Sequence, residues 1–271
     1  LTSVGANRIV VCFESEKADE YEAQFKRIAF DNYPRHLLGA VPMLFASELA
    51  DDVSTERRCW TAMINSFLHP AMENFLYNAE NRLREYRTKN PLLIFRNDGD
   101  ASRVAKTIAV KTYSSGPRGG MEGVKTFSKQ YNLPNVLSMD VGGTTTDIGH
   151  VIGHGVHEQR RGTVEGVPIS FALCEIASPG VGGSSILTVK NGAIQVGPES
   201  VGAVPGPACF GRGGKNATIT DVNLLLGLLD PSTFFGGGLA LDLERARTAI
   251  AENIATPLGV TTDEALLKLR D

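Results

Sequence analysis

The segment that most constrains this chain reads Ser-Met-Asp-Val-Gly-Gly-Thr-Thr-Thr-Asp-Ile-Gly, over residues 138–149. An apolar run delivers Asp140 to the end of an expected strand, and a Gly-Gly pair and three threonines separate it from a second carboxylate, Asp147. Glycines let a backbone approach a polyanion closely because they carry no Cβ atom. Successive amide groups in such a turn form a concave anion site. The segment therefore predicts a phosphate-binding turn.

Each part of this turn has an expected role. We expect Asp140 to hold Mg²⁺, directly or through water, since carboxylate oxygens suit that ion, and Asp147 to position water or the metal. The residues expected to contact phosphate are the glycines and threonines between them: Gly142, Gly143, Thr144, Thr145 and Thr146. A tight hairpin with a threonine-rich return strand is the alternative, because Gly-Gly between strands is also a hairpin signal. The two flanking carboxylates favour phosphate binding.

Composition excludes several classes of protein. The 271 residues carry a net charge of −3, which gives no electrostatic case for nucleic acid or for an anionic membrane. No apolar run approaches the roughly 20 residues of a membrane-spanning helix. Four widely spaced cysteines without a CxxC pair indicate a reducing cytoplasm rather than a disulfide framework. The chain begins at Leu1 in a strand-like run and stops at Asp271 within a helical pattern, so we expect an internal piece of a longer polypeptide.

Strand and helix patterns alternate in the first part of the chain. The expected strands cover residues 9–13, 41–45 and 92–95, and the expected helices cover 16–30 and 54–87, the second interrupted at Pro70. This order predicts an α/β fold with a mainly parallel sheet. We divide the chain into an α/β segment, 1–112, and a segment with the phosphate loop and glycine-rich loops, 113–271.

The second segment predicts shorter elements. We expect a helix over residues 121–131, a hairpin with its tip at 153–155, and two more helices. Asp221 is expected to cap the first of these helices, through Leu229, and Asp242 the second, through about Asn253.

Two further loops carry glycines beside hydroxyl groups. Ser115 and Gly116 open a helix, whose first amide groups lack partners within the helix and suit an anion. Gly182, Gly183 and Ser184 form a second flexible loop. We expect both loops to complete the phosphate cradle, although a plain strand-to-helix connection and a bent strand are the corresponding structural alternatives.

Other reactive side chains are expected to have ordinary roles. Arg118 is expected to be exposed, although it lies near a helix start where it is able to reach a phosphate. His150, His154 and His157 surround a hairpin tip, where we expect solvated side chains rather than zinc ligands, since i, i+4 spacing suits zinc only on a helix. Cys209 is expected to be a small buried residue, because no pattern supplies a partner base.

With these motifs in hand, the chain resembles the hydantoinase A/oxoprolinase family, which includes the ATP-binding subunits of acetone and acetophenone carboxylases. The resemblance covers nearly the whole chain. The matching stretches are Ser115–Pro117, Asp140–Asp147, Gly182–Ile186, Val196–Ser200, Gly202–Gly214 and Thr218–Asp221. The stretch Gly202–Gly214 is the most specific of them.

The resemblance implies part of an α/β fold of the actin-like ATPase type (acetate and sugar kinase, Hsp70 and actin), with a mixed sheet and flanking helices. It also implies ATP with Mg²⁺ or Mn²⁺, a hydantoinase B-type partner subunit, and a small carbonyl substrate activated by phosphoryl transfer. Ser185 and the long charged N-terminal segment resemble the ketone carboxylase branch. ATP-dependent hydrolysis of a cyclic amide (a hydantoin or 5-oxoproline) and a non-catalytic nucleotide-binding module remain the alternatives.

Overall fold

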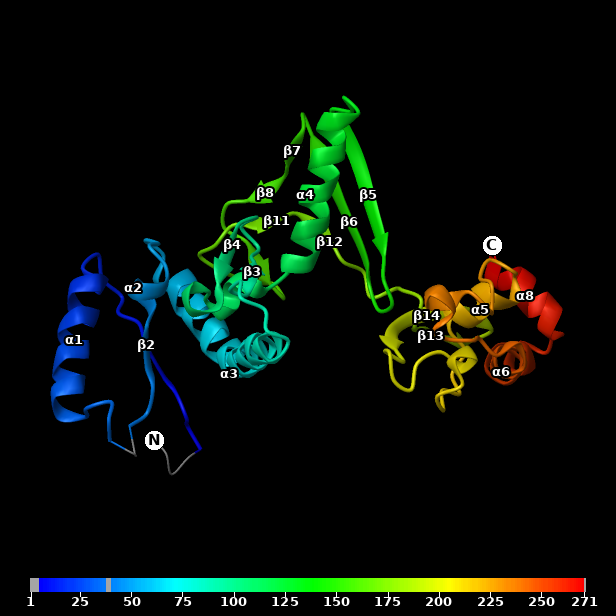
Figure 1. Ribbon diagram of the computed structural model, residues 1–271, viewed down its shortest axis with the longest axis horizontal. Coiled ribbons are helices and arrows are strands. Elements are labelled where there is room, and N and C mark those ends of the chain that lie inside the picture. The colour runs from blue at the N-terminus through cyan, green and yellow to red at the C-terminus, as the bar shows by residue number, and fades with distance from the viewer. Residues whose placement is uncertain (1–4, 38–39, 271) are drawn as a thin grey trace. The chain divides into compact units, whose positions relative to one another are not determined.

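The computed structural model describes residues 5–37 and 40–270, and these form two compact units (Figure 1). The first unit holds the described residues up to Val136, together with His150–Glu175. The second unit holds Leu137–Gly149 and the described residues from Ile176 onward. The chain thus passes between the units more than once.

The first unit opens with a strand, a helix and a parallel strand. β1 (Ile9–Val11) pairs with β2 (Met43–Phe45) in the register Ile9↔Met43, and α1 (Ala18–Asn32) connects them. Three aromatic contacts with ring centroids 6.2–6.5 Å apart join Phe13, Phe25, Phe30 and Phe45. These contacts hold α1 against the strand pair, and the observed elements confirm the predicted β-α-β order of this segment.

A carboxylate is buried beside this aromatic cluster. Glu22 on α1 is 1% exposed. One of its oxygens accepts the Phe13 amide (3.2 Å), and the other accepts the amide and hydroxyl of Ser47 (2.9 and 2.7 Å). A buried carboxylate is costly unless it is hydrogen-bonded. The two bonds from Ser47 link α1 to α2 (Ala46–Leu49), and the bond from Phe13 links α1 to the chain after β1.

The long helix α3 (Thr55–Glu85) is uninterrupted. Ser54 caps it by accepting the Arg57 amide (3.3 Å). The predicted interruption at Pro70 is wrong, since Pro70 lies inside the helix. A proline removes one amide from the helical ladder, and helical turns on both sides keep the segment continuous.

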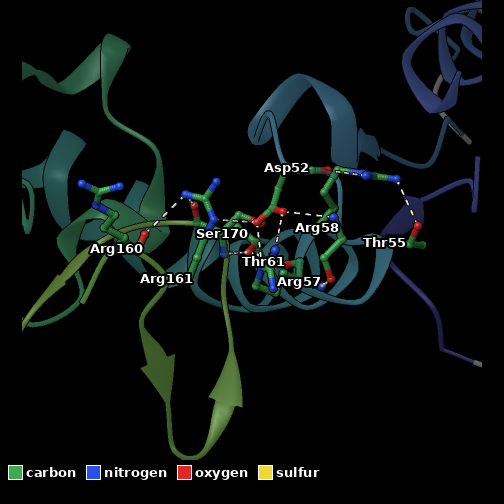
Figure 2. A network of polar contacts seen from close by, with 9 residues as sticks. Asp52, Thr55, Arg57, Arg58, Thr61, Arg160, Arg161 and Ser170 are labelled. Carbon is green, nitrogen blue, oxygen red and sulfur yellow. Dashed lines mark hydrogen bonds and ion pairs between the residues drawn. The ribbon is translucent and has the colours of Figure 1, made fainter. Parts of the chain in front are cut away.

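A buried carboxylate joins the start of α3 to a distant hairpin (Figure 2). The side chain of Asp52 is fully buried and accepts two hydrogen bonds from the Arg57 guanidinium (2.8 and 2.7 Å) and one from the Ser54 amide (3.0 Å). Arg161 Nε lies 3.0 Å from the same carboxylate. These bonds, above all those from Arg57, hold the pKa of Asp52 well below its usual range.

The hairpin that carries Arg161 also contacts α3 directly. The Ser170 amide donates to Thr61 Oγ1 (2.9 Å), and the Thr61 hydroxyl donates to the Arg57 carbonyl (2.6 Å). Thr61 is fully buried, as is the neighbouring Ile169. Residues more than a hundred positions apart are therefore tied together inside the first unit.

Short elements lead from α3 to α4. β3 (Leu93–Phe95) and β4 (Ala101–Arg103) form an antiparallel pair, and 3₁₀ turns at Val104–Lys106 and Ala109–Thr112 follow. The helix α4 (Ser115–Gln130) begins six residues before the predicted start at 121. Ser114 takes a left-handed conformation (φ 55°) that ends the preceding turn. Pro117 fits the first helical turn because amides there need no partner within the helix.

The sheet elements after α4 are short, except for two longer strands. Their bounds are β5 (Asn135–Val141), β6 (Thr146–Ile152), β7 (Gly155–Val156), β8 (Glu158–Gln159), β9 (Thr163–Val164), β10 (Val167–Pro168), β11 (Leu173–Cys174) and β12 (Ile176–Ala177). One sheet has the order β12-β6-β5, with β7 also paired to β6. The predicted hairpin tip is confirmed, with Gly153 and His154 at φ values of 58° and 62°. The β1–β2 pair is parallel, whereas the pairs β3–β4, β6–β7, β6–β12, β8–β11, β9–β10 and β13–β14 are antiparallel. The strand pairing is therefore mixed rather than mainly parallel.

The second unit packs a strand pair against helices. Besides the β5–β6 turn and β12, its elements are β13 (Ser185–Lys190), β14 (Ala193–Ser200), a 3₁₀ turn (Ala208–Phe210), α5 (Ile219–Leu225), a 3₁₀ turn (Phe234–Gly237), α6 (Leu243–Ile250), a π turn (Ala251–Ala255), α7 (Thr256–Leu258) and α8 (Thr262–Arg270). The core gathers buried aliphatic side chains from these elements, including Leu187, Val222, Ile250, Ile254 and Leu266.

Each helix cap described in this unit uses a side chain and an amide that are three residues apart. Asp242 caps α6 as predicted, accepting the Arg245 amide (3.0 Å). α5 ends at Leu225 rather than Leu229, and Thr218 is its N-cap, with Asp221 completing the capping box. Asp221 therefore lies one turn inside the position predicted for it. Among the helices that the structure describes, none is long and apolar enough to cross a bilayer.

Candidate functional site

The predicted phosphate turn lies in the second unit, between β5 and β6. The Gly142 amide donates to the Thr145 carbonyl (2.9 Å) and closes the turn. Asp140, Gly142, Gly143 and Thr144 are all exposed. In the part of the chain that the structure describes, the amides of Gly143 and Thr144 make no hydrogen bond. The turn thus offers a carboxylate and free amides to solvent within five residues.

The same segment is also the hairpin that Gly-Gly favours, since β5 and β6 are neighbours in one sheet. The two readings are compatible. A hairpin turn with unpaired amides is able to bind an anion in the manner of a backbone nest.

The loop that contains Gly182–Ser184 packs directly on this turn. The Gly183 amide donates to the Gly142 carbonyl (2.9 Å), and the Ser184 amide donates to the Gly143 carbonyl (2.6 Å). A Cβ atom on Gly182 would lie 2.6 Å from the Gly142 carbonyl oxygen. The glycine at 182 is therefore required for contact between two backbones, and Gly182 and Ser184 are buried.

Helix α5 supports the loop from the other side. Thr220 donates both its amide (2.9 Å) and its hydroxyl (2.8 Å) to the Gly183 carbonyl. Asp221, fully buried, accepts the amide and hydroxyl of Thr218 (3.0 and 2.7 Å) and the amide of Cys209 (2.8 Å). One series of hydrogen bonds thus joins the stretch Gly202–Gly214, α5, the loop at Gly182 and the turn at Gly142.

The sequence predicts Asp221 as a helix cap. It does not predict that Asp221 lies at the centre of this hydrogen-bonded series. The local signal was available, because the Thr-x-x-Asp pattern at the start of α5 is a capping box. What the pattern does not contain is the contact with Cys209, twelve residues upstream.

The remaining residues of the predicted turn make internal bonds. The Thr146 hydroxyl donates to the Val181 carbonyl (2.6 Å), and Ser178 donates its hydroxyl to Asp147. Thr144 Oγ1 lies 3.5 Å from Ser200 Oγ. These side chains hold the turn in place, and Asp140 alone among its two carboxylates is exposed.

Ser115 and Gly116 belong to the first unit, where they form the first turn of α4. Their part in a phosphate cradle stays a prediction. Arg118, expected to be exposed, is 5% exposed and forms ion pairs with Glu122 (2.8 Å) and Glu158. That expectation is wrong, because Glu158, forty residues away, supplies a second carboxylate for the buried guanidinium.

Cys209 is fully buried, as expected. Burial, together with the nearby carboxylate of Asp221, raises the pKa of its thiol. A protonated, inaccessible thiol is a poor nucleophile, so the structural role is supported.

The histidines near the hairpin tip are not the independent, solvated side chains that we expected. His154 Nδ1 lies 2.8 Å from the Ser128 hydroxyl, so its ring is held against α4. The rings of His150 and His157 are 5.4 Å apart, and His157 Nδ1 lies 2.6 Å from Glu175. They are not independent solvated side chains. No local pattern indicated this cluster, since Glu175 is 18 residues beyond His157.

Comparison with known proteins gives these features a context. The hydantoinase/oxoprolinase family model matches residues 58–268. The acetophenone carboxylase gamma subunit of Aromatoleum aromaticum is 31% identical over 270 residues, which are 98% of this chain and 37% of that protein.

Two solved structures share the fold. An acetone carboxylase in its nucleotide-free form superposes with a TM-score of 0.86 at 25% identity, covering 100% of this chain and 38% of that one. The ATP-dependent caprolactamase of Pseudomonas jessenii gives 0.73 at 26% identity, covering 99% and 39%. The predicted partial α/β fold of the actin-like type is confirmed. The chain spans less than two fifths of the length of these relatives, and it belongs to the hydantoinase/oxoprolinase family.

Proposed function

We propose that this chain is part of an ATP-dependent enzyme subunit that binds ATP with Mg²⁺ at the Gly142 turn and activates a carbonyl substrate by phosphoryl transfer. The observation that carries the proposal is the turn itself, where exposed amides and Asp140 stand on a backbone fixed by the Gly182 loop. The ATP dependence of the related acetone carboxylase and caprolactamase supports the choice of nucleotide.

The donor set fits a hard divalent cation. Asp140 supplies carboxylate oxygens, which Mg²⁺ prefers, and its exposure leaves room for the waters that Mg²⁺ retains. Mn²⁺ accepts the same ligands. Bound there, the ion would neutralise charge on the phosphates. Asp147, which accepts a hydrogen bond from Ser178, would orient a water near the turn.

The protein's contribution to the reaction is positional and electrostatic. Phosphoryl transfer needs amide groups and cations fixed around the phosphate oxygens, rather than covalent help from the protein. Gly143 and Thr144 would donate their amides, while Gly182, Gly183 and Ser184 keep the turn from relaxing. Ser115 and Gly116, at the start of α4 in the first unit, stay a separate prediction as phosphate contacts.

We favour a ketone as the substrate, with carboxylation as the reaction, in complex with a hydantoinase B-type partner subunit. The acetophenone carboxylase relative aligns over 98% of the chain, and acetone carboxylase superposes better than caprolactamase (TM-score 0.86 against 0.73). The free state of all four cysteines supports a reducing, cytoplasmic location.

The second candidate is ATP-dependent hydrolysis of a cyclic amide, which the likeness to caprolactamase favours. Both candidates share the activation step and differ in the acceptor. Incubation of the complete complex with ATP, Mg²⁺ and either a ketone with bicarbonate or a lactam separates them, because phosphate or AMP release should depend on one substrate class. ATP binding without any substrate-dependent turnover would instead indicate a non-catalytic module.

The site is tested by Asp140→Ala in the polypeptide that contains this chain, assembled with its partner. We expect substrate-dependent ATP turnover to fall about 100-fold or more, the usual cost of losing one electrostatic contact to a transition state. Asp263→Asn, an exposed carboxylate of α8 in the same unit, is the matched control and should retain turnover. Survival of Asp140→Ala within about threefold of wild type would show the assignment to be wrong.

A further inference from the structure

Strand register brings three metal-ligating side chains together in the first unit. β6 and β7 pair in the register Val151↔Val156, so the next step places His150 opposite His157. β12 pairs with β6 in the register Ile176↔Gly149, which places Glu175 beside His150. The Glu175 amide donates to the His157 carbonyl (3.0 Å) and closes the arrangement. The three positions are therefore neighbours through backbone pairing.

The side chains converge as well. One ligand atom from each of His150, His157 and Glu175 lies within 4.8 Å of those of the other two. Nδ1 of His157 is 2.6 Å from the Glu175 carboxylate, and the two imidazole rings are 5.4 Å apart and tilted by 31°. His150 is half-buried, and the other two are exposed, so an ion and its waters have access.

We propose that His150, His157 and Glu175 bind a first-row divalent cation of the zinc type. Two imidazoles and a carboxylate are a ligand set that Zn²⁺ takes, with a fourth position left for water or an incoming group. Ligands about 2.1 Å from one ion are at most about 4.2 Å apart. Small side-chain rotations are therefore enough to close the cluster on the ion.

The neighbouring charged groups are paired elsewhere, so His150, His157 and Glu175 are available as metal ligands. The adjacent carboxylate Glu158 is already paired with Arg118, and the third histidine of the hairpin, His154, is held by Ser128. Among the described residues, the ion-pair partner of Glu175 is His157 itself, with no lysine or arginine competing for it. A metal would replace this His-Glu contact with a stronger one.

A bound ion would clamp the β6–β7 hairpin to the segment between β11 and β12. The site is chemically distinct from the Gly142 turn, because Asp140 offers only oxygen, whereas two imidazole nitrogens prefer zinc-type ions to Mg²⁺. Zn²⁺ binding is therefore measurable without ATP, and its outcome does not depend on the proposed function.

The test uses the polypeptide that contains this chain, stripped of metal and dialysed against Zn²⁺ in excess Mg²⁺. We expect wild type to bind one more Zn²⁺ than His157→Ala, and Glu175→Gln to weaken that binding at least tenfold. His154→Asn is the matched control, since it removes a histidine from the same hairpin and asparagine tolerates the positive φ there. It should bind Zn²⁺ like wild type.

Co²⁺ absorption provides a second readout on the same variants. Wild type and His154→Asn should show the visible bands of a low-coordinate Co²⁺ site, and Glu175→Gln should lose or shift them. If His157→Ala does not fold, as judged by circular dichroism in chelator, Glu175→Gln decides, because it preserves side-chain shape. Equal Zn²⁺ affinity and equal Co²⁺ spectra in wild type and Glu175→Gln would overturn the proposal.

Discussion

Asp52→Asn is the most informative perturbation of the first unit. The substitution keeps the side-chain shape but removes the charge that receives two hydrogen bonds from Arg57 and an ion pair from Arg161. It also sets an amide NH₂ group against guanidinium donors. Hydrogen bonds to charged groups contribute about 1.5–3 kcal/mol each when they are buried.

The net cost is smaller than the sum of these contacts. The guanidinium side chains are 29% (Arg57) and 48% (Arg161) exposed, so both are able to recover solvation when the carboxylate is lost. We therefore expect about 2 kcal/mol, below the roughly 3–5 kcal/mol of a fully buried broken pair. At 1.4 kcal/mol per factor of ten, this corresponds to about 30-fold in a local opening equilibrium.

Hydrogen exchange measured by mass spectrometry reads that equilibrium directly. A peptide covering residues 158–171 contains the Ser170 amide bonded to Thr61 and the Gly162 amide bonded to Phe171. Both should exchange about 30-fold faster in Asp52→Asn. Asp51→Asn, the exposed neighbour, is the control and should leave both unchanged. Exchange in Asp52→Asn within about threefold of wild type at both sites would refute the reasoning.

Three further predictions follow from buried groups. Arg57 holds the native pKa of Asp52 below its unfolded value of about 3.9, so the stabilisation from the charged Asp52 is present above that pH and lost as pH falls toward the native pKa. The difference in urea midpoint between wild type and Asp52→Asn should therefore shrink below about pH 4. A constant difference down to about pH 2 would contradict this. Gly182→Ala places a Cβ 2.6 Å from the Gly142 carbonyl oxygen and should lower the free energy of unfolding by about 2 kcal/mol. In the control Gly143→Ala, the new Cβ has its nearest contact at Ser184 Oγ, 3.7 Å away, and the loss should be under about 0.5 kcal/mol in the same denaturation assay. Equal losses for the two variants would contradict the prediction. The Cys209 thiol, whose pKa is raised by burial, should resist iodoacetamide at pH 8 in the native protein and react once urea unfolds it, as peptide mapping would show; native labelling at the unfolded rate would contradict this.

The features that the sequence predicts well are local ones. Asp242 caps α6 through an amide three residues away, and the hairpin tip at Gly153 needs a positive φ that glycine allows. The phosphate turn lies between two strands, as its apolar flanks indicate. Such features depend on residues that are adjacent in the chain, so the pattern contains all the information required.

The features that it predicts poorly depend on distant partners. Arg118 is buried because Glu158 lies beside it, and the histidine cluster exists because Glu175 is brought to His150 by strand pairing. Gly182 illustrates a different difficulty, since close approach to a ligand and close approach to another backbone both require glycine. The pattern indicates that a side chain is excluded there without indicating what excludes it.

The contact between the Gly142 turn and the Gly182 loop has a practical consequence for mutational work. Its two hydrogen bonds join main-chain amides to main-chain carbonyls. Alanine substitutions at the non-glycine positions remove side chains and leave those groups in place, so they will not detect these two hydrogen bonds. Replacing the amide of Gly183 or Ser184 with an ester, which has no N–H to donate, would weaken the contact while every side chain stays as it is.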